Sequence, residues 1–252
     1  MIIPGLILAV LMYRTIREPE YLHTVKSQEA EKSDQVESDK KYRFVDVFRY
    51  RNIKLAILGL CGTMTCIFIL SSMIPNYLID YLKLSVTEMG FVTSGIGFGA
   101  FFGQLAIPGI SDRIGRKMAI VTSLICGIGL LIIFINMGSS PISLFLLLFF
   151  VAFCANGCLC LLGGTIAIES VPAAMGSSAV GTIIGIGEIF GGGVAPVVGG
   201  YIAQNFGIEN TLFLALAGLI ICTIVCLFMK ETAPIKVNKL SPQSAEVNSV
   251  KI

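Results

Sequence analysis

Six long apolar stretches constrain what this chain can fold into. About 20 helical residues cross the ~30 Å hydrocarbon core of a lipid bilayer, and each stretch is long enough to do so. Inside lipid every backbone polar group must be satisfied within the protein, which favours helices over open strands. The chain is therefore predicted to be all-α, a polytopic membrane helix bundle over residues 55–229. The six predicted helices cover residues 55–78, 89–110, 118–137, 142–164, 178–203 and 210–229.

The composition argues against a soluble enzyme. Hydrophobic residues make up 55% of the chain and charged residues only 13%, whereas a soluble domain has about 25% charged residues. The eight cysteines all lie in apolar stretches without His or acidic companions, where thiols act as small hydrophobic groups. The sequence has no phosphate-binding loop, no Ser/His/Asp set and no metal cluster. No enzymatic activity, cofactor, metal or nucleic-acid partner is therefore expected.

The distribution of basic residues predicts the orientation in the membrane. Of the 18 Lys and Arg residues, 10 precede the first stretch, three lie between the second and third, and four follow the last. The alternating topology puts all of these on one side and leaves only Lys83 on the other. Basic residues mark the cytoplasmic side of membrane proteins. Both ends of the six-helix unit are thus expected to be cytoplasmic, in a cell membrane.

The flanking segments have different compositions. Residues 1–13 are apolar but too short to span, and the charges follow rather than precede them, so they are interpreted as the remnant of a preceding transmembrane helix. Residues 14–54 are rich in charged and polar side chains and are predicted to form a cytoplasmic linker, which ends in a short amphipathic segment at 44–48. Residues 230–252 are expected to be a cytoplasmic tail.

A charged motif, SDRIGRK at residues 111–117, separates the second and third stretches. It resembles the cytoplasmic loop motif of the major facilitator superfamily of secondary transporters, G-x-x-x-D-R-x-G-R-[RK]. Pro108 stands where the family has its leading glycine. The matching residues are Asp112, Arg113, Gly115, Arg116 and Lys117.

The resemblance implies a transporter that works by alternating access, in which two helix bundles rock against each other. The chain then looks like the carboxyl-terminal six-helix half, with the missing amino-terminal half or a second copy as its partner. Glu169-x-x-Pro172 resembles a second element of the same family. By that resemblance Glu169 pairs with Arg113 or Arg116 in a cytoplasmic gate, and Asp112 faces a helix of the other half. The alternative is that the basic loop serves only as a topology signal.

Internal symmetry points to the same organisation. Residues 109–115 and 200–207 each end in a glycine and follow the second helix of a three-helix set. Aligned on Gly115 and Gly207, they predict two inverted three-helix repeats.

Small residues predict where helices approach one another closely. Gly95, Gly99 and Gly103 form a stripe on the second helix, and Gly181 and Gly185 share a face of the fifth. Three further glycines at 191–193 are expected to weaken or kink the fifth helix.

Glu188 lies near the middle of the fifth stretch, and none of the six stretches contains a Lys or Arg. An ionised carboxylate there costs about 2.5 kcal/mol or more, so such residues usually face a cavity, a partner or a proton path. Glu188 is therefore a candidate for proton coupling; the alternative is a protonated acid that hydrogen-bonds a neighbouring helix.

Polar residues inside the stretches are candidates for lining a cavity, and the alternative is that each makes an ordinary interhelical hydrogen bond. Asn156-Gly157 is expected to interrupt the fourth helix. The candidates are Asn76, Gln104 and Asn156.

A narrower resemblance concerns residues 188–196 and the tail at 230–234, which look like the organic anion:cation symporter group of the superfamily. The sequence thus predicts a lipid-embedded secondary active transporter of a small polar solute, an organic anion such as a carboxylate or sugar acid, coupled to a proton. The alternatives are a non-transporting sensor or scaffold of the same fold, or an inactive truncated fragment.

Overall fold

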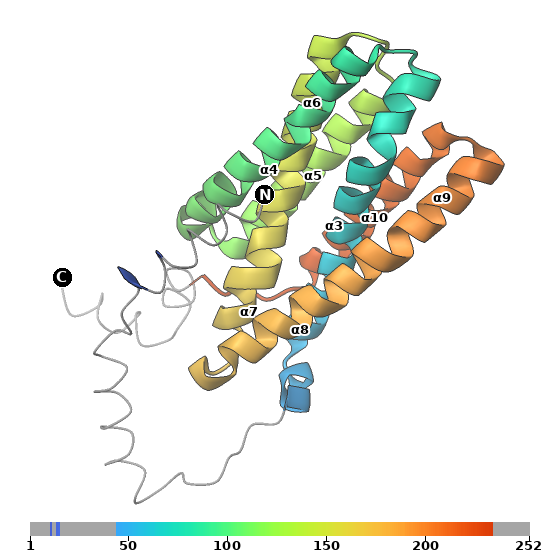
Figure 1. Cartoon of the computed structure of the whole chain (residues 1–252). Helices are drawn as coiled ribbons and strands as arrows, with labels where there is room; N and C mark the ends of the chain where they lie inside the picture. Colours follow the sequence, from blue (N-terminus) through green and yellow to red (C-terminus); the bar gives the residue numbers. More distant parts are fainter. Residues whose placement is uncertain (1–10, 12–13, 16–43, 234–252) are drawn as a thin grey trace, which may run out of the picture. The chain divides into compact units, whose positions relative to one another are not determined.

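The computed structural model describes Leu11, Arg14, Thr15 and residues 44–233 (Figure 1). Most of the helix remnant predicted at 1–13, of the linker before residue 44, and of the tail after residue 233 lies outside the described residues. The amphipathic segment predicted at 44–48 forms a 3₁₀ helix, η1 (Phe44–Arg49), which buries Val47 and exposes Val45.

Six helical spans, each long and apolar enough to cross a membrane, make up residues 51–227, and the described part of the chain contains no strand. The prediction of an all-α, six-helix membrane bundle is therefore confirmed. The spans are α3 (Arg51–Asn76) with the π-helix η2 (Tyr77–Tyr81); α4 (Val86–Ile114); α5 (Arg116–Ile135); α6 (Pro141–Cys160), η3 (Leu161–Thr165) and α7 (Ile166–Glu169); η4 (Ala173–Met175), α8 (Gly176–Glu188), η5 (Ile189–Val194) and α9 (Ala195–Phe206); and η6 (Ile208–Asn210) with α10 (Thr211–Leu227).

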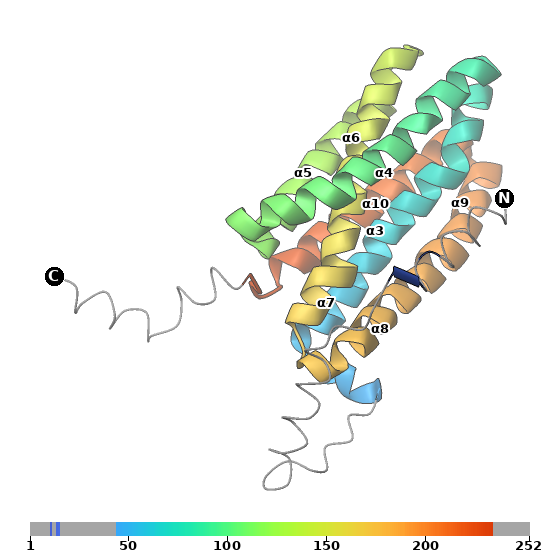
Figure 2. The same ribbon diagram turned by 60° about the vertical axis from the view of Figure 1, so that its left-hand side comes forward.

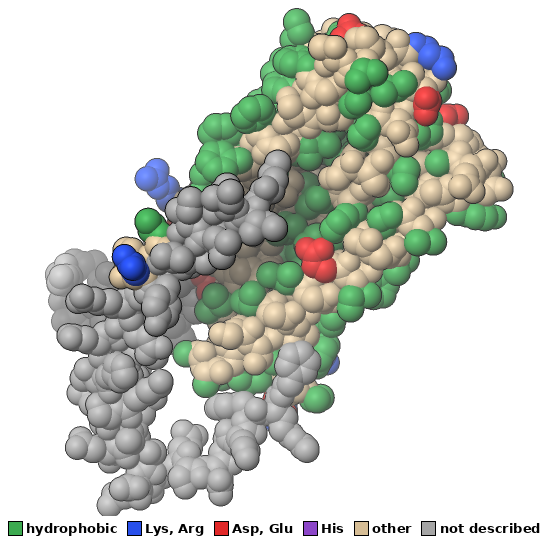
Figure 3. Space-filling model, viewed as in Figure 1, with side chains coloured by type: hydrophobic (Ala, Val, Ile, Leu, Met, Phe, Trp, Pro, Cys, Tyr) green, Lys and Arg blue, Asp and Glu red, His purple; other side chains and the backbone are tan. Residues whose placement is uncertain are grey.

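Several helices continue beyond the apolar stretches at their polar ends. The first span begins at Arg51 instead of residue 55, and α4 continues to Ile114 instead of residue 110. Hydropathy detects only the part of a helix that lies in hydrocarbon, whereas the backbone hydrogen bonds continue into the polar turns. Figure 3 shows hydrophobic side chains distributed over this side of the bundle.

Among the described helices, α4 and α6 share the most extensive contact, and glycines make it possible (Figure 2). A side-chain carbon added at Gly95 would lie 2.9 Å from the carbonyl oxygen of Phe145. At Gly99 and Gly103 it would collide with the carbonyl oxygens of Phe149 and Phe153. The backbones thus approach closely and make many dispersion contacts. These contacts stabilise the pair, because in lipid the hydrophobic effect does not drive helices together.

The glycines of the fifth span behave differently. Gly181 and Gly185 are exposed, and an added side-chain carbon would meet nothing within 4 Å at either position. The next glycines along, Gly187 and Gly191, pack against Leu60 and Met64 of α3. Among the described glycines of the fifth span, therefore, Gly187 and Gly191 make close contacts with α3, and the Gly181–Gly185 pair does not.

The interruption predicted at Asn156-Gly157 is wrong, because α6 continues through both residues to Cys160. Gly157 instead makes room for the side chain of Ile107 from α4. The departure from α-helical geometry comes later, in η3. In the fifth span, the weak point predicted at the three consecutive glycines takes the form of the π-helix η5.

The two inverted repeats are marked by a shared backbone conformation. Gly115 joins α4 to α5 with φ 103° and ψ 148°, and Gly207 follows α9 with φ 98° and ψ 149°. Among the described glycines these two have positive φ. Other residues are strained in this region, so glycine is required at the same place in both repeats.

The α4–α6 contact can be tested with two alanine substitutions on one helix. Gly103→Ala should lower the free energy of unfolding by about 1–3 kcal/mol, because the added carbon collides with the backbone of α6. Gly97 has open space beside it, so Gly97→Ala is expected to be neutral or slightly stabilising. Denaturant titration of the purified protein in detergent measures both, and equal losses would contradict the packing account.

Candidate functional site

The charged motif lies almost entirely in helices. A seven-residue loop is expected at 111–117, but α4 ends at Ile114 and α5 begins at Arg116, so Gly115 alone connects them. The backbone N–H of Gly115 donates to the carbonyl of Ser111 at 2.9 Å. We call the end of the bundle at this turn the Gly115 end, and the end at the α9–α10 turn the Gly207 end.

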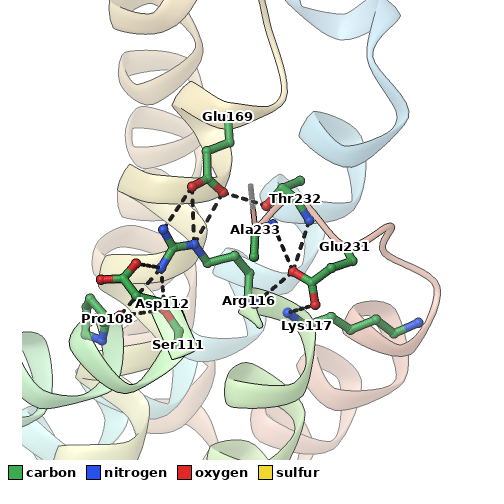
Figure 4. Close-up of polar contacts among 9 residues, drawn as sticks. All are labelled: Pro108, Ser111, Asp112, Arg116, Lys117, Glu169, Glu231, Thr232 and Ala233. Atoms are coloured by element: carbon green, nitrogen blue, oxygen red, sulfur yellow. Dashed lines mark hydrogen bonds and ion pairs between the residues drawn. The ribbon is translucent and has the colours of Figure 1, made fainter. Parts of the chain in front are cut away.

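Arg116 is the centre of the site, because its largely buried guanidinium binds two acids (Figure 4). Its Nε donates to both carboxylate oxygens of Glu169, at 3.2 Å to Oε1 and 3.3 Å to Oε2, and its Nη2 donates to Oε1 at 2.9 Å. These are charge-assisted hydrogen bonds, which are stronger than neutral ones. Its Nη1 donates to Asp112 Oδ1 and, at 2.6 Å, to the hydroxyl of Ser111. The motif turn is thus tied to the end of α7.

Glu169 links this pair to the chain that follows α10. The Thr232 hydroxyl donates to Glu169 Oε2 at 2.7 Å, so the carboxylate receives bonds from two segments. The Glu169 side chain is 18% exposed and that of Asp112 is 60% exposed, so Arg116–Glu169 is the better shielded ion pair. Because water reaches this pair less, its hydrogen bonds contribute more to the stability of the fold than those between Arg116 and Asp112.

Glu231 caps α5 from outside the helix. Its carboxylate accepts from the backbone N–H of Arg116 at 2.8 Å and of Lys117 at 3.3 Å. The first N–H groups of a helix lack partners within it, and a carboxylate there also meets the positive end of the helix dipole. Gly115, at the N-cap position, has no side chain that could do this. The carboxylate is itself held by the backbone N–H groups of Thr232 and Ala233.

Two basic residues complete the same end by binding the carboxyl terminus of α10. Lys117 Nζ donates to the carbonyl of Leu227 at 2.6 Å, and Arg51 donates to that of Phe228 at 3.3 Å. Cations at this position satisfy free carbonyl groups and the negative end of the dipole. Asn52 of α3 also exchanges hydrogen bonds with the backbone of Lys230.

The structure distinguishes between the two arginines proposed as partners of Glu169. Arg116 makes the pair, whereas Arg113 is exposed and has no hydrogen bond or ion pair among the described residues. Sequence reasoning missed Glu231. The available signal was an acid two residues after the last apolar stretch, at the end where α5 would begin without a capping side chain.

The intramembrane candidates do not converge on one another. Glu188 is exposed at the end of α8, where η5 begins, and makes no hydrogen bond or ion pair with a described residue. Asn76 and Gln104 are also exposed, on α3 and α4. Asn156 is buried and donates to the carbonyl of Ala152 in its own helix at 3.0 Å. Within the described residues Glu188 is therefore not the hydrogen-bonded packing acid of the alternative interpretation.

The ion pair of Arg116 can be tested by neutralising each acid separately. Glu169→Gln should reduce the free energy of unfolding by about 1.5–3 kcal/mol, since it weakens a shielded charge-assisted contact. Asp112→Asn should reduce it by less than about 1 kcal/mol, because that carboxylate is mostly in solvent. Chemical unfolding in detergent compares the two; a larger effect of Asp112→Asn would contradict the central role of Glu169.

Removing the cap should loosen α5 locally. Glu231→Ala is expected to cost about 1 kcal/mol and to speed hydrogen exchange at the amides of Arg116 and Lys117. Glu231→Gln keeps an amide oxygen that can accept these bonds. The amides of Arg116 and Lys117 should therefore exchange more slowly in this variant than in Glu231→Ala. Hydrogen exchange followed by mass spectrometry measures the exchange rates of these amides. Unchanged exchange in Glu231→Ala would show that the cap does not hold the turn.

Comparison with known proteins places this geometry in a family. The model of the Major Facilitator Superfamily matches residues 1–182 and 56–250. A multidrug resistance protein, MdtG, of Escherichia coli (strain 55989 / EAEC) is 28% identical over 189 residues, which cover 71% of this chain and 44% of the relative. MdtG of Escherichia coli O1:K1 / APEC matches with the same identity and coverage. The chain thus spans less than half the length of these relatives.

A solved structure shows the same fold. The crystal structure of an auto-inhibited peptide transporter of the POT family superimposes with a TM-score of 0.59 at 18% identity, covering 70% of this chain and 36% of the other. Since the family model matches well over half of its residues, this chain belongs to the Major Facilitator Superfamily of membrane transporters and is not an enzyme.

Proposed function

We propose that this chain carries out secondary active transport of a small polar solute by proton-coupled alternating access. The observation that carries the proposal is the position of Glu188, halfway along the span Ala173–Phe206. At 1.5 Å per residue it lies more than about 20 Å from either end of that span. It is exposed and has no partner among the described residues, so it faces whatever adjoins this surface.

Glu188 can couple protons to movement because its charge is tolerated only where water or a partner reaches it. An ionised carboxylate at this depth in lipid costs about 2.5 kcal/mol or more. When the surface is open to water, Glu188 can release its proton; when it is closed, Glu188 must be protonated or paired. Opening and closing of the surface thereby become linked to proton uptake and release.

The Gly115 end supplies the gate in this proposal. The Arg116–Glu169 pair and Glu231 hold α4, α5, α7 and the segment after α10 together, so this end moves as one piece. Asp112 remains exposed and is available to an opposing helix bundle. The positive charges at this end support a cytoplasmic orientation, with both ends of the six-helix unit inside. The opposing bundle is either an amino-terminal half, as the greater length of the relatives supports, or a second copy.

Two substrate classes are candidates. The resemblance of residues 188–196 to organic anion:cation symporters favours an organic anion. An anion needs a basic partner, and the described Lys and Arg residues lie near the helix ends, so that partner would come from the opposing bundle. The relatives named for multidrug resistance favour a drug, and the exposed carboxylate of Glu188 would suit one that carries a positive charge.

Neutralising Glu188 tests the coupling. In proteoliposomes of the complete membrane protein, Glu188→Gln should abolish accumulation driven by a pH gradient but retain exchange of labelled substrate, since only the titrating group is lost. Glu209→Gln, which changes an acid at the Gly207 end, is the matched control and should behave as wild type. Gradient-driven accumulation by Glu188→Gln would exclude the coupling role.

The same assay separates the remaining possibilities. Competition by simple carboxylates and sugar acids supports the organic anion, and competition by cationic drugs supports the second candidate. If the wild-type protein neither accumulates nor exchanges either class, a non-transporting sensor or scaffold, or an inactive fragment, becomes the better interpretation.

A further inference from the structure

An apolar groove lies between α4 and α5, beside the turn at Gly115. Its volume is about 270 Å³, and Phe153 and Cys154 of α6 form part of its lining. One wall includes Ile107, Ile110 and Ile114, and the other runs from Ala119 to Cys126. Figure 2 shows the two helices side by side. The groove therefore begins where α4 meets α5 and extends about 10 Å along the bundle, at 1.5 Å per residue of α4.

The lining suits a thin hydrocarbon occupant. The Thr122 hydroxyl is already bonded to the carbonyls of Met118 and Ala119, so it does not need a partner in the groove. Pockets for drug-sized ligands are typically ~300–1,000 Å³ and contain a few placed polar groups. This groove lies at the lower limit of that size and is predominantly apolar, which fits a single acyl chain better than a polar solute.

An exposed cation, Arg113, lies on the last turn of α4, next in the chain to the lining residue Ile114. Arg113 follows Ile110 by three residues and precedes Ile114, so it occupies the adjoining surface of the same helix turn. It is exposed and makes no hydrogen bond or ion pair with a described residue. The other two basic residues of the motif are engaged, Arg116 with Glu169 and Lys117 with Leu227. A guanidinium binds a phosphate through two parallel hydrogen bonds.

We propose that this groove is a lipid site, which holds one acyl chain of an anionic phospholipid whose phosphate binds Arg113. The depth of the groove agrees with this assignment. The acyl chain would lie in the leaflet at the Gly115 end, and the phospholipid headgroup would be level with the Gly115 turn. The site is next to the gate: Ile114 and Ala119, which line it, flank Gly115 and Arg116. A bound chain would keep α4 and α5 at a fixed separation and so stabilise the turn that positions Arg116.

The absence of tryptophan from the chain allows a direct test. Ile110→Trp places a single reporter at the groove, and Ile224→Trp places one on α10 as the matched control. Both isoleucines are 51% exposed, and both lie about one helical turn from the Gly115 end. Each variant of this chain is reconstituted in phosphatidylcholine with a minor fraction of brominated phosphatidylglycerol, which quenches tryptophan fluorescence on contact.

The proposal predicts quenching of Ile110→Trp well above that of Ile224→Trp, with the excess lost when Arg113→Gln is added. Lys83→Gln, at the opposite end, should leave the excess unchanged. Native mass spectrometry of the unaltered chain provides a second measurement: phosphatidylglycerol retained by the wild type should be lost in Arg113→Gln. Three results would each overturn the proposal. They are equal quenching at the two positions, an excess that survives Arg113→Gln, and an Ile110→Trp reporter that no lipid reaches because protein covers it.

Discussion

Helix ends are the points at which a membrane bundle must satisfy polar groups that hydrocarbon cannot. Each helix leaves free N–H groups at its start and free carbonyls at its finish. At the Gly115 end these are met by side chains from elsewhere in the chain: Glu231 serves the start of α5, and Lys117 and Arg51 serve the finish of α10. The Arg116–Glu169 pair then joins this set to α7. One residue of the charged motif, Lys117, thus also completes the end of a helix, and Arg116 joins the same end to α7.

The sequence was sufficient to predict the helices but not how their ends are joined. Apolar length alone predicted six spans, because hydrocarbon thickness fixes the number of residues that a helix needs to cross it. The family motif narrowed the partner of Glu169 to two arginines. The choice of Arg116 depends on α4 continuing to Ile114, which leaves Arg113 exposed and begins α5 at Arg116. For Glu231 the only signal was its place two residues after the last apolar stretch, because a cap from a distant segment of the chain is defined by proximity in space and leaves no spacing pattern.

The glycines show why one residue type can have several roles. In α4, Gly95, Gly99 and Gly103 allow close helix contact, since α6 occupies the space that a side chain would need. Gly115 exists for backbone conformation, at an angle that other residues rarely adopt. Gly181 and Gly185 meet neither condition within the described residues, although their spacing resembles that of the first group. Spacing predicts which face glycines share, and the neighbouring helix decides whether that face is used.

The π-helix η5 divides the fifth span into two segments, α8 and α9, whose side chains are rotated relative to each other about the helix axis. A π turn holds more residues than an α turn, so it rotates everything that follows relative to what precedes it. Before η5, Glu188 points to the open surface; after it, Gly199 of α9 packs against Ile69 of α3. With this offset both halves of the span pack on α3, α8 through Gly187 and α9 through Gly199, while Glu188 is exposed. A single residue deleted from η5 would remove that offset and turn one of the two faces away from its proper environment.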